Sequence, residues 1–231
     1  MIRVIGFDLD DTLWAVKPVI IAAEKKLQAH LAETVPSFSM DVETMRTHRE
    51  AVMREDPNLR HQLTEMRRRV IERALMASSL ARADAERVSV DAMEVFLAAR
   101  NDITFFTGVE EGLAELHGHY EMGALTNGNA DIRRVGLHRY FTFAFSAEEV
   151  GAPKPEPHLF EAALAHLGVR PEEMAYVGDD PALDVDAANR LGLTSVWMKN
   201  EAKAGGGETE PDAVISDLRE LPDVIRKLSA G

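Results

Sequence analysis

Two carboxylates follow an apolar segment near the amino terminus. Residues 2–7 are mostly apolar, and Asp8 and Asp10 come directly after them. A buried parallel strand reads as such an apolar run, and open α/β sheets bind ligands at the carboxyl ends of their strands. In an extended chain a spacing of two points both side chains to one side, where two like charges need a cation between them or a proton on one of them. The pattern predicts a metal or acid-base site.

A second polar group follows the apolar residues 122–125. Thr126 and Asn127 stand there beside a glycine, which together supply a hydroxyl, an amide and an unhindered backbone. Such a group is typical of a phosphate cradle. Further along, Lys154 lies between Pro153 and Pro155. The prolines stiffen this loop, so the lysine loses less freedom when it binds an anion.

More carboxylates follow the apolar residues 174–177. Asp179 and Asp184 stand there, where another strand end is expected. Because the available ligands are oxygens and few in number, they suit Mg²⁺ far better than zinc. All of these side chains are expected at one edge of a sheet.

Two patterns of hydrophobic residues divide the chain. From Pro18 to about Arg100 the period is helical and glycine is nearly absent, whereas from Thr107 onward strand and helix alternate. The expected strands are 122–125, 141–145, 174–177, 195–198 and 213–215, and the expected helices are 109–116, 157–167, 181–191 and 218–228. This order predicts an α/β fold, a Rossmann-like doubly wound parallel sheet with an all-helical insertion after its first strand. Residues 1–16 and 101–231 would form the core and residues 17–100 the helical cap domain.

Composition excludes several classes of protein. The 231 residues are 45% hydrophobic, which is enough for a real core. A net charge of −13 argues against a nucleic-acid surface, and the absence of cysteine excludes disulfides and thiolate zinc sites. The sequence shows neither a signal segment nor a membrane span, so we expect a cytoplasmic protein that acts on a small molecule as a monomer or homodimer.

With these motifs in this order, the chain resembles the haloacid dehalogenase superfamily of aspartyl-phosphate phosphatases. The resemblance implies a C1-type cap, with Asp8 as the nucleophile and Asp10 as the general acid and base. It further implies that Mg²⁺ binds Asp8, the Asp10 carbonyl oxygen and Asp179, and that Thr126, Asn127 and Lys154 bind phosphate. Thr12 and Asp184 are expected to contact these residues and hold them in position.

The carboxylate at Asp10 favours a phosphatase, because the true dehalogenases of this family lack it and displacing a halide needs no acid. A finer resemblance is to the YigB-type phosphatases, which act on flavin mononucleotide (FMN) and on the riboflavin precursor 5-amino-6-(5-phospho-D-ribitylamino)uracil. Trp14 would then stack on a flat substrate ring or else pack within the protein. The alternatives are a phosphatase for a pyrimidine nucleotide, sialic acid phosphate or phosphoglycolate, a phosphomutase, and a non-catalytic binding protein.

Overall fold

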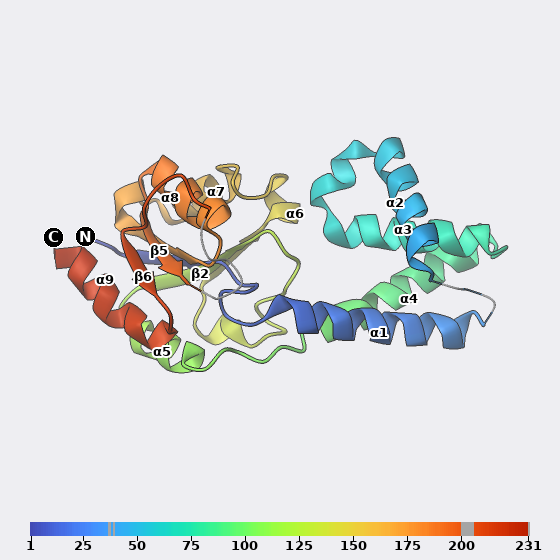
Figure 1. The fold of residues 1–231 in the computed structure, drawn as a ribbon, viewed down its shortest axis with the longest axis horizontal. Helices are drawn as coiled ribbons and strands as arrows, with labels where there is room; N and C mark the ends of the chain where they lie inside the picture. Colours follow the sequence, from blue (N-terminus) through green and yellow to red (C-terminus); the bar gives the residue numbers. More distant parts are fainter. Residues whose placement is uncertain (37, 39, 200–205, 231) are drawn as a thin grey trace. The chain divides into compact units, whose positions relative to one another are not determined.

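The computed structural model describes residues 1–36, 38, 40–199 and 206–230. The chain divides into two compact units (Figure 1). The first combines Met1–Val16 with Ile103–Gly231, and the second is Lys17–Asp102. None of the described helices is long and apolar enough to cross a lipid bilayer.

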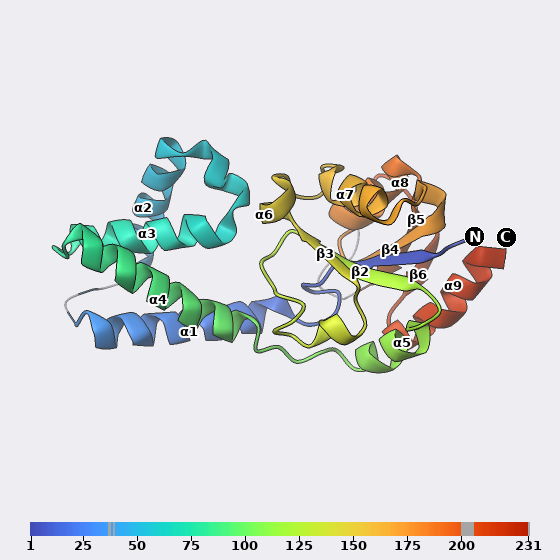
Figure 2. The same ribbon diagram turned by 180° about the vertical axis from the view of Figure 1, so that it is seen from behind.

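The first unit is built on a six-stranded sheet in the order β3-β2-β1-β4-β5-β6, and every neighbouring pair is parallel (Figure 2). The strands are β1 (Val4–Phe7), β2 (Glu121–Thr126), β3 (Phe143–Ser146), β4 (Met174–Gly178), β5 (Thr194–Met198) and β6 (Ala213–Ile215). The order reverses direction at β1, as a doubly wound sheet requires. The predicted fold class is confirmed.

The described helices of this unit are α5 (Val109–Leu116), α6 (Ala147–Val150), α7 (His158–Leu167), α8 (Asp186–Leu191) and α9 (Leu221–Ala230), with short helical turns at Leu137–Arg139, Pro171–Glu173, Pro181–Val185 and Leu218–Glu220. The helix predicted over 181–191 is split into a π-type turn and α8. The Asp180 carboxylate caps the turn by accepting hydrogen bonds from the backbone N–H groups of Ala182 and Leu183. The turn is wider than an α-helical one, because the Asp186 N–H donates to the Pro181 carbonyl oxygen five residues earlier.

The register of the sheet brings the polar groups together. Phe7 on β1 pairs with Ala124 on β2 and with Val177 on β4, so these three strands end at nearly the same level. Apart from the exposed Glu121 at the start of β2, the residues of these strands are buried, as expected where helices cover both faces of a parallel sheet. The polar segments that follow β1, β2 and β4 therefore meet at one edge.

The second unit is all-helical. Its helices are α1 (Val16–Thr34), α2 (Val42–Glu55), α3 (Leu63–Ala77) and α4 (Arg82–Arg100), with a 3₁₀ turn at Pro57–His61. Ala23, Leu27 and Leu31 form the buried stripe of α1, as their helical spacing predicts. They share one apolar cluster with Ile71, Leu75, Val88 and Phe96.

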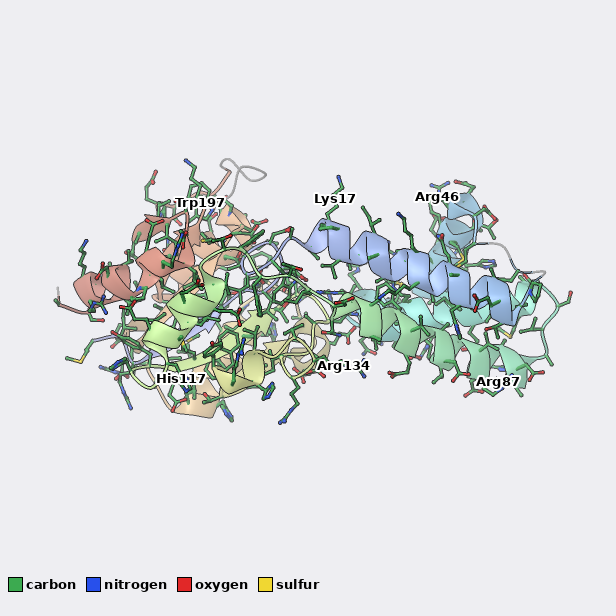
Figure 3. All side chains as sticks on the ribbon, turned by 90° about the horizontal axis from the view of Figure 1, so that it is seen from below. Lys17, Arg46, Arg87, His117, Arg134 and Trp197 are labelled. Carbon is green, nitrogen blue, oxygen red and sulfur yellow. The ribbon has the colours of Figure 1, made fainter. Side chains whose placement is uncertain are left out.

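Ion pairs cover the outer faces of these helices. Arg68 on α3 pairs with Glu65 at 2.7 Å and with Glu72 at 2.8 Å. The hydrogen bond from Arg68 lowers the pKa of Glu65 to about 2. Arg46 and Arg87, both labelled in Figure 3, pair with carboxylates of their own helices. These basic side chains are therefore largely committed to acidic neighbours.

We expect Leu27→Ala to destabilise the helical unit by roughly 2–5 kcal/mol, because removing this fully buried side chain leaves a cavity in the core. Ile21→Ala on the same helix is the matched control, since Ile21 is 46% exposed. Urea denaturation followed by circular dichroism should show a clearly lower midpoint for Leu27→Ala alone. Equal midpoints for the two variants would contradict this assignment of the core.

Candidate active site

Asp8 lies at the carboxyl end of the central strand and is buried. Its backbone N–H donates to the Val177 carbonyl oxygen at 2.8 Å, which continues the β1–β4 ladder by one step. Its carboxylate Oδ1 accepts from Lys154 Nζ at 2.6 Å, and Oδ2 accepts from the Thr12 hydroxyl at 3.3 Å. The side chain is thus fixed from the strand and from two neighbours.

Lys154 reaches this carboxylate from the proline-rich loop. Its ammonium donates to Asp8 Oδ1, to Asp184 Oδ1 at 2.7 Å and to the Tyr176 hydroxyl at 2.7 Å. Three acceptors use all three N–H donors of a lysine. The side chain is buried, so its orientation is set entirely by these partners.

Burial and charge oppose one another in this group. Burial by itself would lower the pKa of Lys154, but the carboxylates of Asp184 and Asp8 outweigh it and hold that pKa well above its usual value. Burial also raises the pKa of Asp8 to about 7, against the opposing attraction of Lys154. One ammonium therefore faces two buried carboxylates. When both carboxylates are ionised, the group has a net negative charge that a further cation would neutralise.

Tyr176 is a member of the site that the sequence reasoning missed. Its hydroxyl accepts from Lys154 and donates to the Leu125 carbonyl oxygen on β2 at 2.9 Å. Its ring packs edge-on against Phe160, with centroids 4.8 Å apart. The available signal was one hydroxyl-bearing ring in the otherwise apolar segment 174–177, because a buried tyrosine oxygen needs hydrogen-bond partners.

Thr126 and Asn127 lie at the end of β2, beside the lysine loop. The Asn127 amide forms two hydrogen bonds with the Lys154 backbone: it accepts from the N–H at 2.7 Å and donates to the carbonyl oxygen at 3.0 Å. The buried Thr126 hydroxyl accepts from the Gly128 N–H at 2.9 Å. Asn127 thus holds the loop that presents Lys154, a role that its sequence position did not reveal. Contact of Thr126 and Asn127 with phosphate stays a prediction.

The second carboxylate group follows β4. Asp179 Oδ1 accepts from the Thr12 hydroxyl at 3.3 Å, and its carbonyl oxygen accepts from the indole N–H of Trp197, which Figure 3 labels on the same unit, at 2.9 Å. Asp184 packs directly on Gly178: a Cβ at that position would lie 2.3 Å from the Asp184 carboxyl carbon. Gly178 therefore has to lack a side chain for Asp184 to reach Lys154.

Asp8, Asp179 and Asp184 form a candidate metal site. Each offers a carboxylate oxygen, and these oxygens all lie within 4.8 Å of one another. A hard divalent cation suits this set, because the donors are oxygens and because a single ammonium offsets their charge. The predicted ligands were Asp8, the Asp10 carbonyl and Asp179, so the presence of Asp184 in the group is an addition.

The side chain of Asp10 has different surroundings from the buried three. Strand β1 ends at Phe7 and the chain turns: the Leu13 N–H donates to the Leu9 carbonyl oxygen at 2.8 Å, and Asp11 has a φ of 62°. The Asp10 carboxylate nevertheless lies near enough to Asp8 for its charge to add to burial, the larger cause, in raising the pKa of Asp8. The Asp10 carboxylate accepts from the Trp14 indole N–H at 3.0 Å and is partly exposed.

Trp14 has no exposed surface, and its ring lies 6.0 Å from that of Phe105. A ring without an exposed face cannot stack on a substrate, so the structure corrects that expectation. Packing was the other reading of Trp14 that the sequence allowed, and the structure agrees with it. The cause is the turn after β1, which directs the indole inward to Asp10.

The pKa of Asp8 predicts how stability changes with pH when no divalent cation is bound. A carboxyl whose pKa is raised to about 7 in the folded protein, from an ordinary 3.8, stabilises the fold below about pH 4, and this contribution is lost as the pH rises through 7. Asp8→Asn removes this loss. The melting temperature of the variant, measured as its difference from that of the wild type, should therefore be higher at pH 8 than at pH 5.

The control for this measurement is Asp91→Asn, because the Asp91 side chain is 57% exposed. The control should leave the difference from wild type nearly the same at both pH values. If Asp8→Asn behaved in the same way, the pKa of Asp8 would not be raised in the folded protein.

Comparison with known proteins agrees with this geometry. Residues 2–192 match the family model described as haloacid dehalogenase-like hydrolase. The chain is 32% identical, over 97% of its length and 96% of the relative's, to the 5-amino-6-(5-phospho-D-ribitylamino)uracil phosphatase YigB of Escherichia coli K12. It is also 37% identical over 134 residues to a phosphoserine phosphatase of Thermus thermophilus, covering 55% of this chain and 54% of that one.

A similar solved structure is a crystal structure described as that of a 2-haloacid dehalogenase from Pseudomonas syringae pv. Tomato DC3000. Its TM-score is 0.94 at 37% identity, with 98% of this chain and 99% of that chain covered. The family match spans well over half of the chain, and the resemblance inferred from the motifs is confirmed. The chain belongs to the haloacid dehalogenase-like hydrolases and is an enzyme of that class.

Proposed function

We propose that the chain is a Mg²⁺-dependent phosphomonoesterase that works through an aspartyl phosphate. The observation that carries the proposal is the buried cluster of Asp8, Lys154, Asp179 and Asp184 at the ends of adjacent strands, with the Asp10 carboxylate beside it. Family membership and the phosphatase relatives support the same reaction. The substrate is then a small phosphorylated molecule.

Asp8 is the nucleophile in this scheme. Its carboxylate oxygen attacks phosphorus, the bond from phosphorus to the ester oxygen breaks, and Asp10 gives its proton to the departing alkoxide. Water then attacks the aspartyl phosphate while Asp10 takes a proton from it, which releases phosphate and restores Asp8. Dividing the reaction in this way replaces one high barrier by two lower ones.

Lys154 and Thr126 hold the phosphoryl oxygens. Lys154 already uses its three N–H donors, so a phosphoryl oxygen has to replace one acceptor. The bond to Asp8 Oδ1 is the natural one to exchange, because that oxygen itself becomes part of the acyl phosphate. Asp184 and Tyr176 keep the ammonium in place during the exchange.

Asp8, the Asp10 carbonyl oxygen and Asp179 would hold Mg²⁺, with Asp184 close behind. When bound, the ion supplies the positive charge that lets an anionic carboxylate approach an anionic phosphate. The Thr12 hydroxyl lies between two of these residues, 3.3 Å from Asp8 Oδ2 and 3.3 Å from Asp179 Oδ1. Its single proton is donated to one carboxylate at a time.

Hydrolysis of a 2-haloacid is the second candidate, since the structural neighbour of 37% identity carries that name. Asp8 could displace halide from carbon in the same position. Halide leaves without a proton, however, and that reaction gives no role to the Asp10 carboxylate. We therefore rank it below phosphate ester hydrolysis.

The substrate proposed within this reaction is FMN or 5-amino-6-(5-phospho-D-ribitylamino)uracil. The ribitylaminouracil phosphate rests on the similarity to the Escherichia coli phosphatase over nearly the whole of both chains, and FMN rests on the resemblance of the motifs described above. A screen of phosphorylated metabolites should place these ribityl phosphates first, ahead of pyrimidine nucleotides, phosphoserine and phosphoglycolate. A strong preference for one of the others would overturn the substrate and spare the reaction.

Asp8→Asn should reduce turnover of para-nitrophenyl phosphate to near background, because the variant lacks the attacking carboxylate. Asp10→Asn should differ in kind: esters with poor leaving groups should lose about 10²–10⁴-fold, and para-nitrophenyl phosphate much less. Steady-state assays of para-nitrophenyl phosphate and of an ester with a poor leaving group make the comparison. Halide release from 2-chloropropionate is measured in parallel. Halide release without phosphate release would favour the dehalogenase.

Removal of divalent cations by a chelator should abolish phosphatase activity, and added Mg²⁺ should restore it. Asp179→Ala should raise the Mg²⁺ concentration needed for half-maximal activity at least tenfold, because it removes one of the few anionic ligands. Titration of activity with Mg²⁺ measures this. Glu172→Ala is the control and should leave the Mg²⁺ requirement as in the wild type, because the Glu172 side chain is 59% exposed and precedes β4, at the opposite edge of the sheet. Full activity in the chelator would refute metal dependence.

A further inference from the structure

We propose that Trp14 is a positioning residue for the general acid and base Asp10. This inference rests on the proposed phosphatase function and adds a residue to it. The indole N–H of Trp14 donates to Asp10 Oδ1 at 3.0 Å, within the same turn of the first unit. The indole N–H can only donate, so the direction of this bond is fixed in every protonation state of Asp10.

The donor is held rigidly. The Asp11 N–H donates to the Trp14 carbonyl oxygen at 2.7 Å, and the Phe106 N–H donates to the Leu13 carbonyl oxygen at 2.9 Å. The Trp14 ring is fully buried and packs against Phe105. A buried indole that is fixed through its backbone and its ring offers its N–H along one direction, which is what orienting a catalytic group requires.

Asp10 is the carboxylate for which such orientation matters. Asp8, Asp179 and Asp184 are at most 7% exposed and are held by the lysine, by threonine or by backbone groups. Asp10 is partly exposed, as a group that meets a leaving alcohol and then a water molecule must be. The indole N–H of Trp14 therefore contributes to the orientation of a carboxyl group that has to serve both tasks.

The hydrogen bond also distinguishes the two oxygens of Asp10. Because Oδ1 accepts the indole N–H, the acid form carries its proton on Oδ2. The bond therefore selects which oxygen delivers the proton to the ester oxygen and later receives one from water. Loss of the indole N–H should leave the acid in place but remove this selection of the oxygen that carries the proton.

The test is Trp14→Phe, which keeps an apolar ring and removes the N–H. The measured quantity is kcat/KM for an alkyl ester, glycerol 2-phosphate, and for para-nitrophenyl phosphate. The alkyl ester needs the acid and should lose about tenfold, whereas para-nitrophenyl phosphate should change by less than about twofold. Phe143→Leu, a core substitution on β3, controls for lost packing and should affect both esters equally.

A double-mutant cycle with Asp10→Asn separates positioning from packing. If Trp14 acts through Asp10, adding Trp14→Phe to Asp10→Asn should cause no further loss with the alkyl ester. Equal losses for both esters, or a full extra loss in the double variant, would overturn the inference and leave the proposed function standing. A wild-type protein that hydrolyses neither ester would overturn the proposed function and this inference with it.

A readout independent of activity uses the indole protons. The chain has two tryptophans, so two indole N–H resonances are expected in a ¹H–¹⁵N spectrum. Asp10→Ala should move the Trp14 resonance upfield and speed its exchange with solvent, and Trp14→Phe identifies which resonance it is. An unchanged Trp14 resonance in Asp10→Ala would show that the hydrogen bond is absent in solution.

Discussion

The ammonium of Lys154 between the carboxylates of Asp8 and Asp184 is the interaction on which the site depends. All three groups are buried, and a buried charge without a partner is strongly destabilising. The pairing is arranged so that each charge has an opposite neighbour at 2.6–2.7 Å. The carboxylates still outnumber the single ammonium, and a divalent cation would neutralise the remaining negative charge.

Much of the surrounding structure serves this interaction. Asn127 fixes the backbone of the lysine loop, Tyr176 supplies the third acceptor for the ammonium, and Gly178 leaves the space that Asp184 occupies. Asn127 directly follows β2, and Tyr176 and Gly178 belong to β4.

Asp10 shows how the same residue type takes a different role in different surroundings. The buried aspartates are tied to cations or to backbone and hydroxyl donors, and they are suited to attack and to metal binding. Asp10 is partly exposed and bonded to a neutral donor, the indole N–H of Trp14. Separating carboxylates in this way is how one site holds both a nucleophile and an acid.

The sequence by itself determined the fold class and the positions of the polar groups. Apolar runs and helical periods are local patterns, and the carboxyl ends of parallel strands necessarily share an edge. The strand at 213–215 and the helix at 109–116 have the predicted bounds, and Asp8 and Lys154 lie in contact, as the shared edge predicts.

The tertiary structure alone decided which side chains touch. Tyr176, the Asn127 amide and the Trp14 indole act through contacts between residues that are distant in sequence or that meet across a non-repeating turn. No periodicity encodes such contacts, because hydrogen-bond direction depends on where neighbouring strands and loops end in space. The π-type turn that begins the helix over 181–191 likewise depends on backbone hydrogen bonds that span five residues, which the hydrophobic period does not encode.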